Sequence, residues 1–396
     1  MHSKCFIKMC NQYIEKKSLF IQKFDTIEDI VKLPYVLTKD DLRNLYPFKY
    51  NFVEKSEIYE YHESFGTTGK PSAGPLTKKD FNNYIEEILL SPVNFNKQDV
   101  VLIRYPYAIS VPAHIFHRAA HRRNAMVIPC SSRTLVSPYP RVISLLKELE
   151  VSVFCCMPSE AINLATFAQF MGYGIKSDFK NLRAICTAGE LLTPSMKKYI
   201  EDLWNVEVYN FYGSTEAGNI AYSCKNGNLH IADNFFNIDI VNIEENKKNK
   251  FNQLGNIILT SKNKEALPLL KYHTEDIGYI EKQCDCGKKG HILYHYGRMS
   301  DFYFINEKKI YFRNIKDCMF DIINKHNLSP FWRAFKENNR IRIEIESDVS
   351  LGFLDLEIID RISCDIIVNN VPKNSIFDID KMSEIVPVKK PEYFYQ

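Results

Sequence analysis

The strongest constraint on the fold is a regular alternation of short apolar segments with amphipathic segments in the middle of the chain. Short apolar runs predict strands, and apolar side chains at helical spacing predict the helices between them. The predicted strands are 126–129, 151–157, 182–187 and 206–210, and the predicted helices are 139–149, 159–170 and 194–203. This alternation favours a largely parallel sheet that is covered by helices.

The sequence pattern changes on the C-terminal side of this region. Residues 229–240 and 254–260 predict strands of a smaller β-rich section, and short strands occur together with helices beyond about residue 302. We therefore expect an α/β protein with a large N-terminal domain, residues 1–301, and a small α+β C-terminal domain, residues 302–396. The large domain would hold mostly parallel sheets flanked by helices, plus the β-rich section.

Composition excludes several classes of protein. A hydrophobic fraction of 45% and a charged fraction of 25% are typical of a soluble globular protein. The net charge of +3 is too small to favour a nucleic-acid partner, and no apolar run is long enough to predict a membrane span. Eleven cysteines without a signal-peptide pattern predict reduced thiols in a cytoplasmic protein, and metal ligation stays open for some of them.

Residues 64–71, Ser-Phe-Gly-Thr-Thr-Gly-Lys-Pro, form a candidate phosphate loop. Glycines let the backbone approach a ligand, and hydroxyls, amides and an ammonium group suit phosphate oxygens. The segment is not a Walker loop, because Gly66 and Gly69 are too close together and Pro71 stands where a Ser or Thr would bind magnesium. An ordinary surface turn is the alternative. The candidate phosphate-binding residues are Ser64, Gly66, Thr67, Thr68, Gly69 and Lys70.

Two of the predicted parallel strands end in polar motifs, and ligands bind at the carboxyl ends of such strands. In the second motif Tyr212 offers a flat face for a base, Thr215 a hydroxyl for a phosphate and Glu216 a hard oxygen for Mg²⁺. The alternative is a polar turn that ends in glycine. The candidate residues in the two motifs are Gly189, Glu190, Asn210, Phe211, Tyr212, Gly213, Ser214, Thr215 and Glu216.

Two further motifs lie downstream. Asp276 can accept hydrogen bonds from both hydroxyls of a ribose, and Arg298 follows a glycine and supplies a guanidinium group.

A basic face on the predicted helix around residue 118 is a candidate for substrate binding. It consists of His114, His117, Arg118, His121 and Arg122. A solvated basic face and a wall that prefers an acidic or polar substrate are both open, with His117 and His121 as substrate contacts. A metal cluster is disfavoured, because the arginines repel a cation.

In this order the motifs resemble the adenylate-forming superfamily, and most closely its phenylacetate–CoA ligase branch, which includes acyl-protein synthetases. The resemblance covers most of the chain from about residue 60. It implies ATP-dependent activation of an aryl or acyl carboxylic acid to an acyl-adenylate, with release of pyrophosphate. Transfer to a thiol would follow, on CoA, carrier-protein phosphopantetheine or a protein cysteine. The C-terminal domain would be mobile.

The resemblance also implies a role for each motif. Residues 64–70 would grip the ATP phosphates, and Gly189, Glu190 and the segment 210–213 would bind adenine. Thr215 would touch the α-phosphate, Glu216 would hold Mg²⁺, and Asp276 and Arg298 would bind the ribose region. Lys381 is the best match for the catalytic lysine of the C-terminal domain. Lys389 and Lys390 are alternatives, and all three could instead be surface lysines.

A structural zinc ion is implied by cysteines and a histidine similar to those in this branch. The set is Cys224, His230, Cys284 and Cys286, with His291 as a substitute. Cys3His is a composition that tetrahedral zinc prefers. Unligated reduced cysteines are the alternative.

Three departures from the family pattern motivate a rival hypothesis. Phe65 replaces a small polar residue, Ser300 replaces the hinge aspartate, and the residues 306–312 replace a glycine-containing loop that helps the thiol step. The rivals are a nucleotide-binding partner or regulatory protein without catalysis, and a zinc-dependent interaction module.

Overall fold

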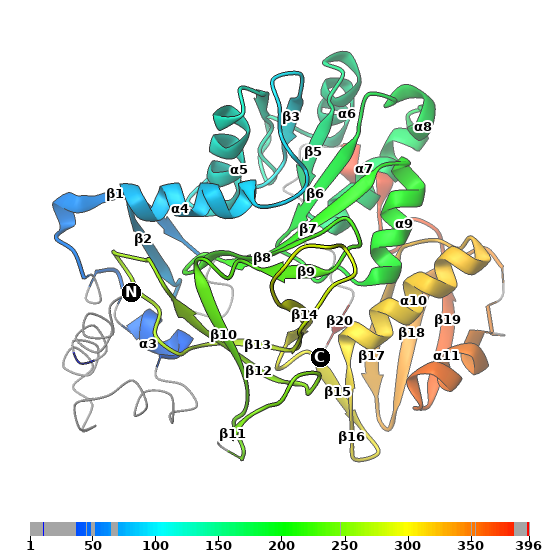
Figure 1. Ribbon diagram of the computed structural model, residues 1–396. Coiled ribbons are helices and arrows are strands. Elements are labelled where there is room, and N and C mark those ends of the chain that lie inside the picture. The colour runs from blue at the N-terminus through cyan, green and yellow to red at the C-terminus, as the bar shows by residue number, and fades with distance from the viewer. Residues whose placement is uncertain are drawn as a thin grey trace. The chain divides into compact units, whose positions relative to one another are not determined.

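The computed structural model describes residues 11, 37–44, 46–48, 52–64, 70–245, 247–349, 351–352, 354–383 and 394–395 (Figure 1). The chain divides into two compact units, each assembled from segments that are distant in sequence. Unit one comprises Met1–Asn94, Tyr107–Ala119 and Phe211–Met299, and unit two comprises Phe95–Pro106, Ala120–Asn210 and Ser300–Gln396. The domain boundary that the sequence places after residue 301 stays a prediction.

Unit one is dominated by antiparallel strands. Its main sheet has the order β11-β10-β12-β13-β14-β9-β8-β7, and a hairpin of β1 and β2 leads into helix α4 (Figure 1). The strands are β1 (Ile58–Glu63), β2 (Ala73–Thr77), the second half of β7 (Glu207–Ser214), β8 (Gly218–Ser223), β9 (Leu229–Ile231), β10 (Phe236–Asn242), β11 (Lys247–Lys248), β12 (Gly255–Ser261), β13 (Tyr272–Glu281) and β14 (Ile292–Arg298). The helices are α3 (Lys39–Asn44), the 3-10 turn η1 (Lys55–Glu57), α4 (Lys78–Leu89) and most of α5 (Val111–Arg122).

Local sequence explains where α4 begins. Thr77 accepts a hydrogen bond from the amide of Asp80, and the Asp80 carboxylate accepts one from the amide of Thr77. This reciprocal capping satisfies two amides that a helix N-terminus would otherwise leave without partners. The Asp80 carboxylate also accepts the amides of Glu265 and Ala266, at 2.7 and 2.9 Å, and so ties the β12–β13 connection to the start of the helix.

Unit two contains the parallel sheet that the sequence predicts. Its order is β6-β5-β3-β4, and each neighbouring pair is parallel. The elements are β3 (Val100–Ile103), β4 (Met126–Pro129), α6 (Tyr139–Glu148), β5 (Val153–Cys156), α7 (Pro158–Phe170), α8 (Ile175–Asp178), β6 (Ala184–Ala188) and α9 (Pro194–Trp204). Strands β5 and β6 are buried throughout, as expected where helices cover both faces. The mixed α/β fold class is confirmed.

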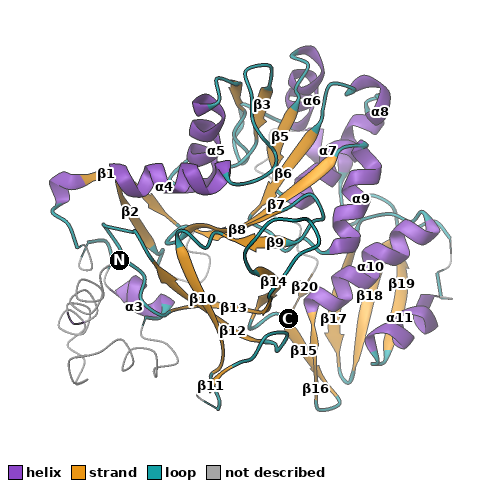
Figure 2. Cartoon of the chain, viewed as in Figure 1, coloured by secondary structure: helices purple, strands orange, loops and turns teal. Residues whose placement is uncertain are grey.

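The C-terminal segment of unit two adds a second sheet, β19-β18-β17-β20, after a β15–β16 hairpin (Figure 2). Helix α10 packs on this sheet through the fully buried Trp332, whose ring lies near those of Phe312 and Phe320. The elements are β15 (Phe302–Ile305), β16 (Lys308–Tyr311), α10 (Phe312–His326), β17 (Trp332–Glu337), β18 (Arg340–Glu346), α11 (Leu354–Ile362), β19 (Ile366–Val371), α12 (Ile379–Ser383) and β20 (Phe394–Tyr395).

Two predicted strands differ from the observed ones. The segment 229–240 forms two strands, β9 and β10, because a turn closed by the Phe235 amide on the Ala232 carbonyl separates them. The polar residues Asp233 and Asn234 in that turn are the signal that periodicity alone overlooks. Strand β7 continues to Ser214, four residues beyond the predicted end.

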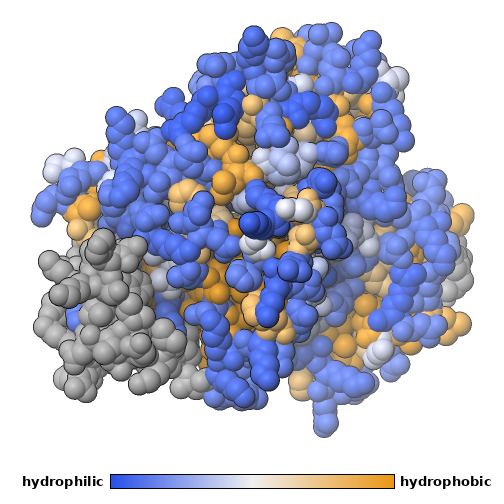
Figure 3. Space-filling model, in the orientation of Figure 1, coloured by the Kyte–Doolittle hydropathy of each residue, from blue (hydrophilic) through white to orange (hydrophobic). Residues whose placement is uncertain are grey.

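The face of the molecule that Figure 3 shows is mainly polar. Hydrophilic residues cover most of the face in Figure 3, with smaller apolar areas between them. Among the helices of the described segments, we find none with both the length and the apolar composition that a bilayer crossing needs.

A buried ion pair stabilises unit two. Nε of Arg104 lies 2.7 Å from Oε1 of Glu160, and both side chains are 2% exposed. The guanidinium also donates to the carbonyls of Ser131 and Ser137, each at 2.7 Å. Arg104 thus compensates the Glu160 carboxylate in a dry environment, where burial raises the pKa of Glu160 and loss of the cation would leave a buried acid without its counter-ion.

We expect Arg104→Met to lower the free energy of unfolding by about 3–5 kcal/mol, because Glu160 then stays buried without its counter-ion. Chemical denaturation of the purified variant measures this. Lys198→Met is the control, since the Lys198–Asp202 pair is exposed on the same unit and should leave the unfolding midpoint unchanged. Equal midpoints for all three proteins would contradict a stabilising role of the buried pair.

Candidate functional site

The Tyr-Gly-Ser-Thr-Glu motif forms the end of β7 and the tight turn into β8. Phe211, Tyr212, Gly213 and Ser214 pair with β8, so they belong to an antiparallel hairpin and not to an open strand end. Gly213 is required there, because a Cβ on it would lie 2.2 Å from the carbonyl oxygen of Gly218. The turn itself carries Thr215 and Glu216, the predicted phosphate and magnesium contacts.

Tyr212, Asp276 and Arg298 form one network in unit one. The Tyr212 hydroxyl donates to Oδ2 of Asp276 at 2.7 Å, and Nε of Arg298 lies 3.3 Å from Oδ1 of the same carboxylate. The Tyr212 ring stacks on His295, with 4.3 Å between ring centroids. The structure therefore brings together the three residues that the sequence assigns to base and ribose, and it adds His295, which the sequence analysis missed.

The network keeps the Asp276 carboxylate ionised. Burial by itself raises the pKa of Asp276, but His295, Arg298 and the Tyr212 hydroxyl outweigh it and hold this pKa below its ordinary value. The charge of Asp276 in turn raises the pKa of Arg298. A buried carboxylate that stays charged at neutral pH is a strong acceptor for two neighbouring hydroxyls.

Glu216 is held at both its backbone and its side chain. Its side chain is buried, and its Oε1 accepts a hydrogen bond from the Tyr272 hydroxyl at 2.5 Å. Its main-chain carbonyl accepts from the Tyr84 hydroxyl at 3.3 Å and from the ammonium group of Lys264. Burial lowers the pKa of Lys264 to about 8. The sequence analysis missed Tyr84, Lys264 and Tyr272, which are distant from Glu216 along the chain.

Only the ends of the phosphate-loop candidate lie among the described residues. Ser64 exchanges hydrogen bonds with Ser72, donating from its amide at 3.0 Å and accepting on its hydroxyl at 2.8 Å. Lys70 is exposed. The predicted contacts Gly66, Thr67, Thr68 and Gly69, and the departure Phe65, lie outside the described residues. Strand β2, which follows the loop, passes close to the β7–β8 turn, since a Cβ on Gly74 would lie 3.1 Å from the Thr215 carbonyl oxygen.

Unit two contains the predicted site residues Gly189, Glu190, Asn210 and Lys381, in addition to His121. Gly189 follows β6 with a φ of +84°, and the Glu190 carboxylate accepts the amide and hydroxyl of Ser159 at 3.0 and 2.8 Å. Asn210 accepts a hydrogen bond from Thr187 at 3.3 Å. Lys381 lies on α12, where its exposed ammonium pairs with Asp378 at 2.7 Å. The alternatives Lys389 and Lys390 fall outside the described residues.

The predicted basic face is partly built into unit one. Nδ1 of His117 lies 3.0 Å from the Tyr107 hydroxyl, and Nε2 of His114 lies 2.8 Å from the Tyr107 carbonyl oxygen. His62 packs on His114, with 5.1 Å between ring centroids. His121 is exposed and belongs to unit two. Because His117 is half-buried beside the ring of Tyr107, the basic face is not fully solvated.

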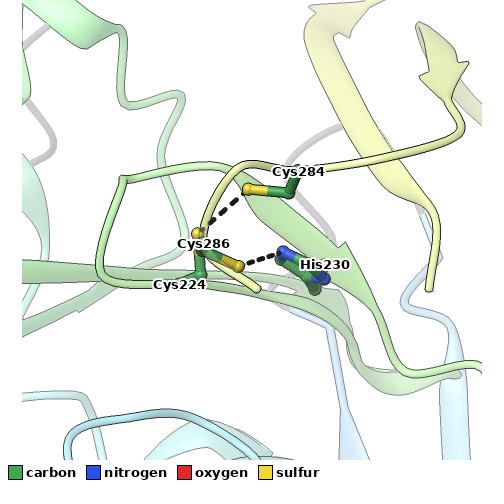
Figure 4. Close-up of side chains that lie close together, drawn as sticks. All are labelled: Cys224, His230, Cys284 and Cys286. Atoms are coloured by element: carbon green, nitrogen blue, oxygen red, sulfur yellow. Dashed lines mark hydrogen bonds between the residues drawn. The ribbon is translucent and has the colours of Figure 1, made fainter. Parts of the chain in front are cut away.

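Cys224, His230, Cys284 and Cys286 come together in unit one (Figure 4). Their ligand atoms lie within 4.8 Å of one another, with 3.7 Å between the sulfurs of Cys224 and Cys284 and 3.3 Å between Sγ of Cys286 and Nε2 of His230. Two thiolates on tetrahedral zinc lie about 3.8 Å apart, so the donor set and its spacing fit this ion. The described group includes His230 and leaves out the substitute His291.

Comparisons with known proteins agree with this geometry. Residues 64–263 match the family model described as AMP-binding enzyme, which is about half of the chain. The phenylacetate-coenzyme A ligase of Thermus thermophilus is 27% identical over 299 residues, 73% of this chain and 65% of the relative. That of Pseudomonas putida is 28% identical over 258 residues, 63% of this chain and 57% of the relative. The chain thus spans less than two thirds of the length of these relatives.

A solved structure supports the same fold. The crystal structure of 2-hydroxyisobutyryl-CoA ligase in the postadenylation state, in complex with 2-HIB-AMP, superposes with a TM-score of 0.83. It is 16% identical, and the match covers 100% of this chain and 89% of that one. The family match, the curated relatives and the fold all confirm the resemblance that the motifs carry. The chain belongs to the AMP-binding enzyme family, on its phenylacetate–CoA ligase-like branch.

Proposed function

We propose that this protein is an AMP-forming acid–thiol ligase, which activates a carboxylic acid with ATP and passes the acyl group to a thiol. The observation that carries the proposal is the network in unit one, where Tyr212 of the β7–β8 hairpin meets Asp276 and Arg298 of the β13–β14 hairpin. A nucleotide base can stack on a flat ring such as that of Tyr212, ribose hydroxyls need a charged acceptor such as Asp276, and an α-phosphate needs a cation such as Arg298. Family membership supports the same activity.

The residues divide the work of adenylation. Asp276 accepts the ribose hydroxyls, Arg298 neutralises the negative charge beside them, and Thr215 donates its hydroxyl to the α-phosphate. Glu216 would hold Mg²⁺, which would supply further charge neutralisation when bound. A carboxylate oxygen of the substrate then attacks the α-phosphorus and pyrophosphate leaves. Both reactants are anions, so positioning and charge stabilisation supply most of the catalysis.

The substrate acid and the thiol acceptor are proposed from the family resemblance and from the side chains of α5. An aryl or modest acyl acid is the default of the resemblance, and the half-buried His117 and Tyr107 favour an acid with a polar group. The curated relatives are named phenylacetate-coenzyme A ligases, which supports CoA as the thiol. Carrier-protein phosphopantetheine and a protein cysteine remain alternative acceptors. The segment that follows the hinge position Ser300 forms the β15–β16 hairpin, with Asn306 and Glu307 both at positive φ in its turn. The thiol step would therefore use a loop that differs from the glycine-containing loop of the family.

Replacing Lys381 tests the adenylation machinery. We expect Lys381→Ala to slow acid-dependent ATP–pyrophosphate exchange about 100-fold or more, because a cation that stabilises transition-state charge is lost, while ATP still binds. Lys373→Ala is the matched control, an exposed lysine of the same segment that pairs with Asp348. Unchanged exchange in Lys381→Ala would overturn the assignment of this lysine.

A second prediction concerns the ribose contact. Asp276→Asn should weaken ATP binding about tenfold or more, since the charged acceptor of the ribose hydroxyls is lost. A 2′,3′-dideoxy analogue of ATP should bind the variant and the parent protein alike. Titration calorimetry with both nucleotides measures the difference, and Asp239→Asn on β10 is the control. An equal loss for ATP and for the dideoxy analogue would contradict a ribose contact.

We further propose that the Cys3His cluster holds a structural zinc ion. Cys224 and His230 flank the β8–β9 turn, and Cys284 and Cys286 lie in the β13–β14 connection, so one ion would clamp two turns of the same sheet. Thiolate and imidazole ligands suit Zn²⁺ better than a hard cation.

Metal analysis of protein purified without chelator should find about one zinc per chain, and Cys286→Ser should lose it and lower the melting temperature. Cys364→Ser, in unit two, should keep the ion. If the purified protein contained no zinc and Cys286→Ser melted at the same temperature as the parent protein, the structural zinc ion would be contradicted.

A further inference from the structure

We propose that Lys264 positions Glu216 for magnesium–nucleotide binding. This inference rests on the proposed function, because it assigns Glu216 to the metal. Lys264 lies in the connection between β12 and β13 and is 8% exposed. Its ammonium donates to the main-chain carbonyl of Glu216 and, at 2.7 Å, to the Tyr84 hydroxyl.

Helix α4 also contacts the β7–β8 turn. The Tyr84 hydroxyl donates to the Glu216 carbonyl at 3.3 Å, and Oε2 of Glu87 accepts the Asn219 amide at 2.7 Å. Gly218 has a φ of +88°, and a Cβ there would lie 2.5 Å from the Tyr84 ring. The turn is therefore seated against two consecutive turns of a helix, with no space for a larger residue at its end.

Lys264 joins these elements through charge. It lies over the Tyr84 ring at 5.2 Å from the centroid, and the carboxylates of Asp80, Glu87 and Glu216 all act on it electrostatically. A buried cation beside these acidic side chains favours the packing of the Glu216 turn on α4. Burial raises the pKa of Glu87 well above its ordinary value, so Glu87 adds little negative charge to this cluster. Asp80 also fixes the residues that follow Lys264, since it accepts the amides of Glu265 and Ala266.

The consequence for the metal comes from the two ends of Glu216. Lys264 and Tyr84 fix its carbonyl, and Tyr272 fixes one carboxylate oxygen. With backbone and side chain both held, the carboxylate keeps one orientation before nucleotide arrives, which lowers the entropy cost of binding a cation. Lys264 itself need not touch the nucleotide, so it is a positioning residue and Glu216 is the ligand that it serves.

The test separates metal-dependent from metal-independent nucleotide binding in the full chain. We expect Lys264→Met to bind metal-free ATP like the parent protein. The Mg²⁺ concentration that half-saturates the nucleotide-binding response should rise about tenfold or more, because the buried Glu216 carbonyl and the acidic side chains beside it lose their shared cation. Tyr84→Phe, which removes one hydroxyl, should shift the same midpoint by a smaller factor. Lys247→Met on the exposed strand β11 is the control and should shift nothing.

Titration calorimetry of ATP at several Mg²⁺ concentrations measures these midpoints without any turnover. Failure of the proposed function would appear as intact Mg²⁺-dependent binding with no acid-dependent exchange in the parent protein, and the Lys264 comparison would still be decided. An unchanged Mg²⁺ midpoint in Lys264→Met, or an equal loss of metal-free and metal-dependent affinity in both Lys264→Met and Tyr84→Phe, would overturn the inference.

Discussion

The burial of two carboxylates in unit one is the constraint on which the candidate site depends. Asp276 and Glu216 are 8% and 4% exposed, and a buried acid destabilises a fold unless hydrogen bonds and cations compensate it. Tyr212 and Arg298 compensate Asp276, while Tyr272 holds Glu216. The β7–β8 hairpin must therefore lie in the same sheet as β13 and β14, and the antiparallel sheet of unit one provides that arrangement, with β9 between β8 and β14.

The same compensation explains why tyrosines surround the buried carboxylates. A tyrosine hydroxyl can donate to a carboxylate while its ring stays in an apolar environment, so it orients the acid without adding charge. Burial and the neighbouring acids raise the pKa values of Tyr212 and Tyr272 well above the ordinary value, and both hydroxyls keep their protons at neutral pH. The carboxylates are thus held in fixed orientations, and in the proposed reaction this would preorganise the site electrostatically.

Sequence alone predicts the parts of this account that are local. The strand–helix alternation of unit two, the Tyr212–Glu216 motif and Asp276 can each be found from short patterns. The Cys3His set follows instead from the family resemblance, because Cys224 and Cys284 are 60 residues apart. His295, Lys264 and Tyr272 could not, because their roles arise from contacts across the sheet; Tyr272 and Glu216 are 56 residues apart, and Lys264 and Glu216 are 48 apart. Lys264 and Tyr272 resemble ordinary residues of a β-rich section until pairing places them beside an acid. The ends of strands are less predictable for the same reason. Strand β7 continues through Gly213, and only its pairing with β8 explains why the strand does not end there.

The most direct test of the central claim is ATP–pyrophosphate exchange by the unmodified protein, with Mg²⁺ present, no thiol acceptor, and a panel of aryl, fatty and amino acids. An enzyme that activates a carboxylic acid should catalyse exchange that depends on one class of acid and requires Mg²⁺. Exchange with that class would establish adenylation before any acceptor is known. Nucleotide binding without exchange across the whole panel would contradict an acid-activating enzyme and favour a nucleotide-binding partner protein.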